Sequence, residues 1–397
     1  MPDRPQIAAL VTELRQYTHG QHFVDRFLEG YGWEGRHHRP PVDLVSLYVD
    51  QHPEGDLTDD RVSRFPMLRL FSSVAEALTL GRDALAVDGV LLIAEHGAYP
   101  ANEKGQKLYP RYELFEQILS VFRASGRTAP LFNDKHLSWN WDWCRAMYDA
   151  SLELGFPFMA GSSLPVTWRT PAVEMPLDAE VEEAVCVASG GLDGGDIHAM
   201  ETLQCMVERR QGGECGVRWL QAYRGEAFWQ AHHDGLWSRE LFEACLCRSH
   251  TLTPARAGFN HHLPTLDEQK QLAADPWAYQ FEHLDGLKST VIMVNGLVRD
   301  FNFAARLRGR EEPLSTQMYL PAPPAHTTLA NFFSPQVNCI ERMFITGRPI
   351  YPVERTLLTS GLVITGVDSL HLDQARISTP HLQIAYTPTP ESTFCRS

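Results

Sequence analysis

Acidic, imidazole and amine side chains that could do chemistry together stand directly after apolar segments, namely Glu95, His96, Asp134, Lys135 and His136. Two further donors, His198 and Glu201, lie three residues apart in a glycine-bracketed segment, so they would share a helix face. Carboxylate and imidazole groups bind zinc, manganese, iron or nickel, and a bound divalent ion brings the pKa of water toward neutrality. We therefore expect a divalent metal site whose ligands are His96, His136, His198 and Glu201.

The other members of this set would carry the acid/base steps. Glu95 or Asp134 would be the general base, and Lys135 would stabilise a developing oxyanion or pass a proton. Each side chain also has a structural alternative, such as a hydrogen-bonded turn at a strand end or a buried ion pair. The metal hypothesis depends on all of them lying around one crevice.

Four further residues are candidates for holding a substrate. They are Arg111, Ser162, Ser163 and Arg209. A guanidinium group can bind a carboxylate or phosphate through two hydrogen bonds, although an ordinary ion pair is the alternative for each arginine. No G-x-S-x-G turn surrounds the two serines, so hydrogen bonding at a strand end is favoured over a nucleophilic role.

Short apolar runs alternate with helix-like segments as far as residue 165. The expected strands are 7–11, 42–49, 68–71, 87–94, 129–132 and 156–161, and the expected helices are 20–30, 73–81, 112–126 and 141–155. Runs of Val, Ile and Leu without alternation are typical of a parallel sheet covered on both faces. We predict an α/β, doubly wound, Rossmann-like domain over 1–165, with the polar residues converging at the carboxyl ends of its strands.

Beyond residue 165 the apolar segments lengthen and partly alternate. This pattern predicts a C-terminal α+β domain over 166–397, with a large, mostly antiparallel open sheet that has one covered face. A glycine-bracketed helix is expected within 194–213, two returning helices at 334–347 and 351–370, and a closing strand at 382–386.

The order of these parts resembles the Gfo/Idh/MocA family of nicotinamide-dependent, mostly sugar-directed oxidoreductases. Lys135 of "DKH" corresponds to the lysine of the family's "EKP" strand end, and His198 of "GGDIHAME" lies near the histidine of its "GG-D-G-H" helix start. For many members the resemblance implies that the second sheet pairs two subunits. We therefore expect a homo-oligomer, either a dimer or a tetramer.

The loop after the first strand departs from the family pattern. There the family has G-x-G-x-x-G, whose glycines let a pyrophosphate approach the backbone and a helix N-terminus. This chain has "TELRQYTHGQH", with one glycine and the bulky residues Arg15, Gln16 and Tyr17. The sequence therefore disfavours NAD(P), and Asp50 would bind a ribose only if that cofactor binds.

We therefore predict an enzyme on a Gfo/Idh/MocA-like scaffold that uses metal-assisted acid/base chemistry. The reaction would be a hydrolysis, elimination or isomerisation of a small polar substrate such as a sugar or hydroxy acid. The second hypothesis is an NAD(P)-dependent oxidoreductase acting on a sugar-like substrate, and the third is a ligand-binding protein without catalysis.

The formal net charge of −14 and the lack of a basic block argue against nucleic acid or an anionic membrane as partners. A small molecule is the expected partner. No apolar run has the length of a membrane span, and the first residues do not follow the pattern of a signal peptide. We expect a cytoplasmic protein.

Overall fold

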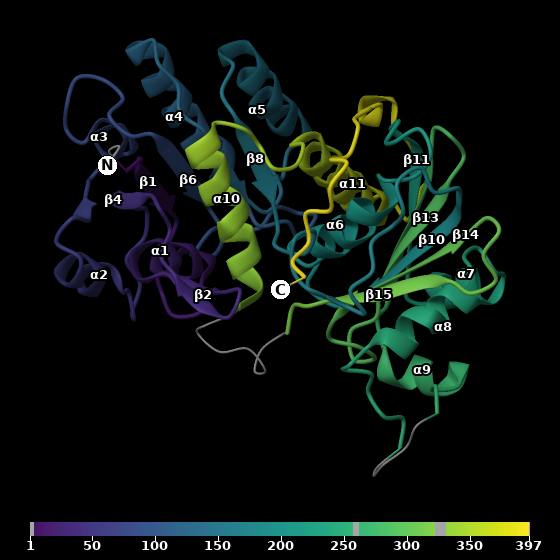
Figure 1. Ribbon diagram of the computed structural model, residues 1–397. Helices are drawn as coiled ribbons and strands as arrows, with labels where there is room; N and C mark the ends of the chain where they lie inside the picture. Colours follow the sequence, from purple (N-terminus) through teal and green to yellow (C-terminus); the bar gives the residue numbers. More distant parts are fainter. Residues whose placement is uncertain (1–3, 257–261, 322–330, 397) are drawn as a thin grey trace.

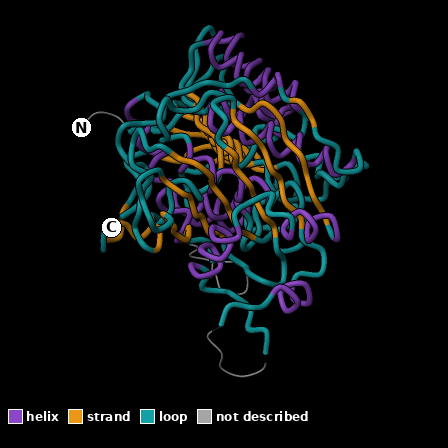
Figure 2. Tube along the Cα trace, turned by 90° about the vertical axis from the view of Figure 1, so that its right-hand side faces the viewer, coloured by secondary structure: helices purple, strands orange, loops and turns teal. Residues whose placement is uncertain are grey.

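Two β-sheets organise the chain, and helices pack on both faces of each (Figures 1 and 2). The computed structural model describes residues 4–256, 262–321 and 331–396. The predicted α/β class, a Rossmann-like parallel sheet followed by a large and mostly antiparallel sheet, is confirmed. None of the described helices is both long and apolar enough to cross a membrane.

The first sheet contains six parallel strands in the order β5-β4-β1-β6-β7-β8. Their bounds are β1 (Gln6–Val11), β4 (Asp43–Val49), β5 (Arg69–Leu70), β6 (Gly89–Ile93), β7 (Leu131–Asp134) and β8 (Phe158–Gly161). The central strands are buried on both faces, which explains why their sequences do not alternate. The strand order reverses between β1 and β6, which is where open α/β sheets bind ligands.

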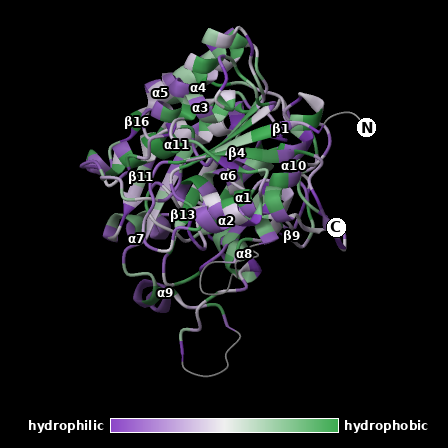
Figure 3. Cartoon of the chain, turned by 90° about the vertical axis from the view of Figure 1, so that its left-hand side faces the viewer, coloured by the Kyte–Doolittle hydropathy of each residue, from purple (hydrophilic) through white to green (hydrophobic). Residues whose placement is uncertain are grey.

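Helices cover this sheet on both sides, with α1 and α10 on one face and α3, α4 and α5 on the other. Their bounds are α1 (His19–Glu29), α3 (Val74–Thr79), α4 (Arg111–Ser125), α5 (Trp141–Leu154) and α10 (Ser334–Thr346). Strands β1 and β4, which lie between these layers, are largely green in the hydropathy colouring of Figure 3. Helix α10 comes from the far end of the chain, so the C-terminal segment completes the N-terminal layer (Figure 1).

Three short elements of this region were not expected from the sequence. They are the hairpin strands β2 (Tyr31–Trp33) and β3 (Arg36–His38), and the helix α2 (Thr58–Arg64). The predicted helix ends at Gly126 and Gly155 are present, with φ angles of 58° and 67°. Glycine takes this left-handed conformation without the steric cost that a Cβ would add.

The second sheet has the strand order β16-β11-β12-β13-β10-β14-β15-β9. Its bounds are β9 (Arg169–Thr170), β10 (Val181–Ala188), β11 (Val217–Arg224), β12 (Trp277–His283), β13 (Lys288–Met293), β14 (Phe301–Leu307), β15 (Leu314–Met318) and β16 (Ile377–Ser378). Strands β10 and β13 are parallel, and the other pairs are antiparallel. The closing strand predicted at 382–386 is wrong, because that segment follows the 3-10 turn η2 (Pro380–Leu382) and makes one isolated bridge through Tyr386.

The expectation of a single covered face on this sheet is also wrong. Helices α6 (Asp196–Val207) and α11 (Glu354–His371) cover one face, and α7 (Glu226–His233) and α8 (Arg239–Arg248) cover the other, followed by α9 (Leu266–Leu272). Strand β10 is apolar on both sides, with Ala184 and Cys186 in one cluster and Val185 and Val187 in the other. The part of the sheet under α7 and α8 is therefore not free to pair with a second subunit.

Gly361 allows close packing of α11 against α5. A Cβ at this position would lie 2.3 Å from Leu382 Cδ2 and 2.7 Å from the ring of Trp141 on α5. Both distances are shorter than van der Waals contact, and the Trp141 ring cannot move away without repacking. The glycine therefore sets the distance between α5 and α11.

We expect Gly361→Ala to lower the free energy of unfolding by about 1 to 3 kcal/mol, because overpacking outweighs the gain in helix propensity. Urea unfolding at constant pH measures this change. Ser120→Ala, on the exposed face of α4, is the control and should stay within about 0.5 kcal/mol of the parent. A Gly361→Ala protein as stable as the parent would show that the contact is not tight.

Candidate functional site

The ends of β6 and β7 and the start of α6 bring a lysine, a histidine and a glutamate together. Lys135 Nζ donates to His198 Nε2 at 2.8 Å and to the carbonyl oxygen of Gly194 at 2.9 Å, and it lies 3.7 Å from Glu95 Oε1. Only 5% of the Lys135 side chain is exposed. Lys135 thus joins the carboxyl edge of the first sheet to α6, the helix that carries His198.

Glu95 is held as a carboxylate by two cations. Burial opposes its ionisation, but Lys135 and Arg111 outweigh that effect and keep the pKa of Glu95 well below its ordinary value. The guanidinium of Arg111, which is fully buried at the first residue of α4, pairs with Glu95 Oε2. Arg111 is therefore bound inside the cluster, where it fixes the second oxygen of the carboxylate.

His136, the residue after Lys135, belongs to a second buried network. Its Nε2 is 3.3 Å from Asp193 Oδ2 and 3.5 Å from Arg111 Nη1. Gln106 donates to Asp193 Oδ1 at 3.1 Å. Burial raises the pKa of Asp193, but His136 and Gln106 outweigh it, so the pKa lies below the ordinary value. This network fixes the loop that precedes α6.

The sequence did not single out His19, which is a further imidazole of the site. Its Nδ1 lies 2.6 Å from Asp134 Oδ2, and its ring packs edge-on against His96 at 5.2 Å and Phe333 at 5.0 Å between centroids. The signal that could have found it is its position directly after the N-cap Thr18, at the first residue of α1. That helix start faces the point where the strand order reverses.

Three non-glycine residues of the site have left-handed backbone conformations. The φ angles are 73° at His96, 66° at Lys135 and 66° at Asp193. Such conformations cost about 1 to 3 kcal/mol each and persist where the surrounding contacts determine them. The strain thus lies at the residues that direct the imidazole, the ammonium and the carboxylate into the site.

The predicted metal site is wrong. Within 4–256, 262–321 and 331–396, no three His, Cys, Asp or Glu side chains are arranged to hold an ion. His198 Nε2 faces the ammonium of Lys135, and His136 Nε2 faces Asp193 and Arg111. Buried cations therefore occupy the space between the predicted ligands, and they would repel a divalent ion. The predicted ligands that do not form a metal site are His96, His136, His198 and Glu201.

Glu201 points to the end of β8 instead of toward His198. Its carboxylate accepts a hydrogen bond from the backbone N–H of Ser162 at 2.6 Å and from the hydroxyl of Thr356 at 3.3 Å. Burial raises the pKa of Glu201 to about 7. Ser162 and Ser163 are both buried at this strand end. Glu201 thus ties α6 to β8 and α11.

Arg209 lies apart from the Lys135 cluster, against the C-terminal tail. Its guanidinium donates to the carbonyl oxygens of Met175, Thr389 and Pro390 at 2.8 to 3.3 Å. These contacts hold the tail against the segment before β10. The structure does not bring Arg209 to the other predicted site residues.

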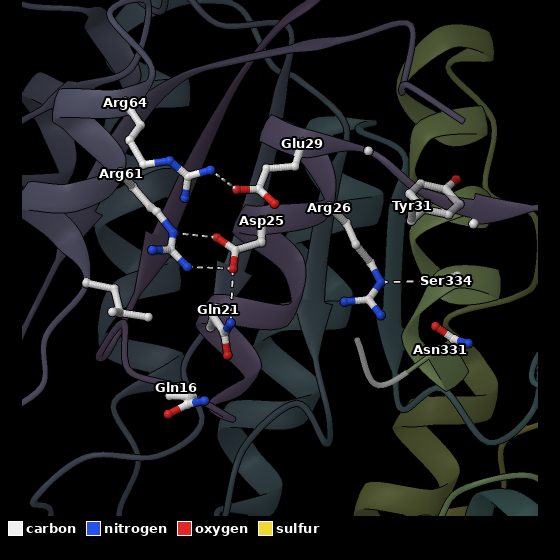
Figure 4. A pocket seen from close by; sticks show the side chains of 13 residues that line it. Gln16, Gln21, Asp25, Arg26, Glu29, Tyr31, Arg61, Arg64, Asn331 and Ser334 are labelled. Atoms are coloured by element: carbon white, nitrogen blue, oxygen red, sulfur yellow. Dashed lines mark hydrogen bonds and ion pairs between the residues drawn. The ribbon is translucent and has the colours of Figure 1, made fainter. Parts of the chain in front are cut away.

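A cavity of about 450 Å³ lies beside α1 (Figure 4). Four of its charged side chains pair with one another: Arg61 bonds both oxygens of Asp25 at 2.8 Å, and Arg64 contacts Glu29 at 2.6 Å. Arg26 donates to Ser334 Oγ at 3.3 Å. None of the sequence-predicted site residues lines it. The cavity separates α1 from α2 and α10 and adds no group to the cluster around Lys135.

Comparison with solved structures shows which fold positions this cluster. The myo-inositol dehydrogenase of Lactobacillus casei, in complex with NAD(H) and myo-inositol, superposes with a TM-score of 0.56 and 11% identity over 98% of this chain and 99% of that one. A putative myo-inositol dehydrogenase of Sinorhizobium meliloti gives 0.57 and 12% over 94% and 99%. The chain has a Gfo/Idh/MocA-like fold. GenD2 from gentamicin A biosynthesis, in complex with NAD, gives 0.56 and 14% over 95% and 97%.

No protein-family model matches the sequence, and no curated protein matches it. The Gfo/Idh/MocA-like neighbours nevertheless correct the predicted chemistry. Most of them are named as dehydrogenases, and several are in complex with NAD or NAD(H). Together with the occupied donors described above, they overturn metal-assisted hydrolysis, elimination or isomerisation and the divalent ion as cofactor.

The raised pKa of Glu201 makes stability depend on pH. A carboxyl group whose pKa rises from 4.5 to about 7 on folding favours the folded state when protonated. The free energy of unfolding should therefore fall as the pH rises from about 4.5 to about 7, by roughly 3 kcal/mol for this group. Buried Asp196, whose pKa is also raised to about 7, adds to the decline.

We expect Glu201→Gln to remove about half of this decline, because the amide keeps the shape of the side chain but does not ionise. Urea unfolding at several pH values between about 4.5 and about 8 measures the slope. A variant with the parental pH dependence would show that Glu201 does not bind a proton in this range.

Proposed function

We propose that this chain is an NAD-dependent oxidoreductase that oxidises a hydroxyl group of a small polyhydroxylated substrate. The observation that carries the proposal is the contact between Lys135 and His198 at the carboxyl edge of a parallel sheet. In open α/β sheets, ligands bind at this edge beside the reversal of strand order. The Gfo/Idh/MocA-like fold, shared with inositol dehydrogenases, supports the same reaction class.

The start of α1 fits a dinucleotide. A Cβ on Gly20 would lie 2.5 Å from the carbonyl oxygen of Glu13 and 3.4 Å from Val11 Cβ, so a glycine is needed for close packing of the helix on the strand. The third glycine of the dinucleotide fingerprint has this role. The helix N-terminus beside it carries partial positive charge, which favours a phosphate group.

The loop before α1 would bind a diphosphate with a side chain where other folds use bare backbone. Arg15 is 42% exposed and pairs with Glu13 at 2.6 Å. Its guanidinium is a fork-shaped donor that suits phosphate oxygens. We propose that Arg15 replaces the charge and donors that the missing glycines would have provided.

Asp50 stands directly after β4, where an acidic residue binds ribose hydroxyls in dinucleotide folds. It accepts hydrogen bonds from the hydroxyls of Tyr48 at 3.0 Å and Tyr99 at 2.5 Å. These tyrosines fix the carboxylate at the edge of the sheet. A carboxylate here would repel a 2′-phosphate, so we expect NAD in preference to NADP.

Buried polar atoms around Lys135 lack partners within the described ranges. They are His96 Nε2, His198 Nδ1 and Asp134 Oδ1. A buried polar atom without a partner costs about 1 to 3 kcal/mol, so a ligand with several hydroxyl groups would be stabilised here. Burial lowers the pKa of His96 to about 4. Burial and the nearby Lys135 also lower that of His198, so both rings are neutral and can accept or donate.

In the proposed reaction, side chains of the protein transfer the proton of the substrate hydroxyl. A substrate hydroxyl beside Lys135 Nζ gives its proton to the lysine as Lys135 passes one of its own protons to His198 Nε2, which lies 2.8 Å away. The charge of Lys135 stabilises the developing alkoxide, and Glu95 keeps that charge in place. NAD, when bound, supplies the acceptor for the hydride that leaves the carbon bearing this hydroxyl.

The test is turnover of NAD⁺ to NADH, followed by absorbance, with a panel of cyclic and acyclic polyols that includes myo-inositol and scyllo-inositol. The proposal expects NADH formation that saturates with at least one polyol. A protein that reduces no NAD⁺ with any of them, and oxidises no NADH with the corresponding ketones, would overturn it.

We expect Lys135→Met to reduce turnover by roughly 10² to 10⁴-fold, because the alkoxide loses its cation and His198 loses its proton donor. NAD binding should change by less than about threefold. Lys288→Met, at an exposed residue of β13, is the matched control and should keep parental turnover. A Lys135→Met protein with more than about a tenth of parental turnover would contradict the role.

A further inference from the structure

Three imidazole rings surround the pair formed by Lys135 and Glu95. They belong to His19 on α1, His96 after β6 and His198 on α6. In the described part of the chain, His19 is the one of the three that bonds a carboxylate, through Nδ1 to Asp134 at 2.6 Å. The three rings are therefore chemically different.

Asp134 determines what the ring of His19 can do. Its side chain is 1% exposed, so the carboxylate has little solvent to stabilise it and a hydrogen bond from Nδ1–H is strongly favoured. This bond orients the ring and leaves Nε2 to exchange a proton, as in other histidine–aspartate pairs. The carboxylate also stabilises a positive charge on the ring.

The other two rings are poor places for a proton to rest. Burial, together with nearby His19 and Lys135, lowers the pKa of His96 to about 4. Burial and Lys135 also lower the pKa of His198 far below its ordinary value. A proton that reaches His198 during the reaction must therefore move on.

His19 is partly exposed, as are His96 and His198. The His19 side chain is 15% exposed, compared with 5% for Lys135 and 1% for Asp134. A proton on His19 therefore has access to water that the Lys135 centre lacks. The titratable groups that face it are Asp134 and Lys135 from β7 and its end, Glu95 and His96 from the end of β6, and His198 from α6.

We propose that His19, oriented by Asp134, is the acid/base group that exchanges the reaction proton with solvent. The proton moves from the His198 ring through Lys135 and the hydroxyl groups of the bound substrate to His19 Nε2, and from there to water. Only N–H and O–H bonds form and break, and the number of electrons on each group is unchanged. This role rests on the proposed oxidation of a polyol and adds the exit for its proton.

The first test does not need turnover. Nitrogen NMR of the histidine rings in the full chain, with His19 assigned by its loss in His19→Gln, reports the tautomer of this ring. We expect a proton on Nδ1 that is hydrogen-bonded to Asp134, and a change in the ring nitrogen signals in Asp134→Asn. A His19 ring that carries no proton on Nδ1, or is unaffected by Asp134→Asn, would overturn the proposal.

The second test is kinetic. His19→Gln should lower kcat by roughly 10²-fold with little change in KM, and should remove the limb of the pH profile that Asp134→Asn displaces. Added imidazole should restore part of the lost rate. The control is His38→Gln, which breaks an imidazole–carboxylate pair of similar length, 2.8 Å to Glu341, on β3 and α10. It should leave kcat and the pH profile unchanged.

The two proposals fail in different ways. If the parent oxidises polyols while His19→Gln keeps the parental kcat, or loses rate that imidazole does not restore, the role of His19 is wrong and the proposed function stands. If the parent oxidises no polyol, the proposed function is wrong, and the role of His19 in this reaction is wrong as well.

Discussion

The buried ammonium of Lys135 is the constraint on which the arrangement of this site depends. A charge taken out of water costs several kcal/mol unless it is paired and hydrogen-bonded. Glu95, His198 and the carbonyl oxygen of Gly194 provide that compensation, and they come from the end of β6 and from the start of α6. The contact between the edge of the first sheet and α6 therefore also compensates the cost of burying the cation.

The supporting groups extend this constraint outward. Arg111 fixes the second oxygen of Glu95 and contacts His136, and His136 in turn faces Asp193 in the loop before α6. The left-handed backbone at Lys135 and Asp193, like that at His96, lies within this group of contacts. The backbone is therefore strained at these three residues, and this conformation keeps an ammonium, two neutral imidazoles and a carboxylate facing one another.

Much of the fold was predictable because it depends on local patterns. Apolar runs gave all six strands of the first sheet, and Gly126 and Gly155 marked helix ends. The meeting of Lys135 and His198 followed from the rule that parallel strands end at one edge and from the resemblance. The directions of the side chains could not be predicted from the sequence. Glu201 shares a helix face with His198, yet it turns to Ser162, and no spacing rule foretells that.

Other features were missed for different physical reasons. His19 reaches Asp134 across 115 residues of sequence, and a contact of that range leaves no local pattern. The glycine-poor loop suggested that no dinucleotide binds, but Gly20 shows that close helix packing survives where the wider fingerprint does not.

Calorimetric titration of the purified chain with NAD⁺ and NADH measures whether this site accepts a nicotinamide cofactor without a glycine-rich loop. We expect one site per chain with a Kd below about 1 mM, and weaker binding of NADPH because of Asp50. No heat of binding for either NAD⁺ or NADH at millimolar concentration, with a folded protein, would contradict it.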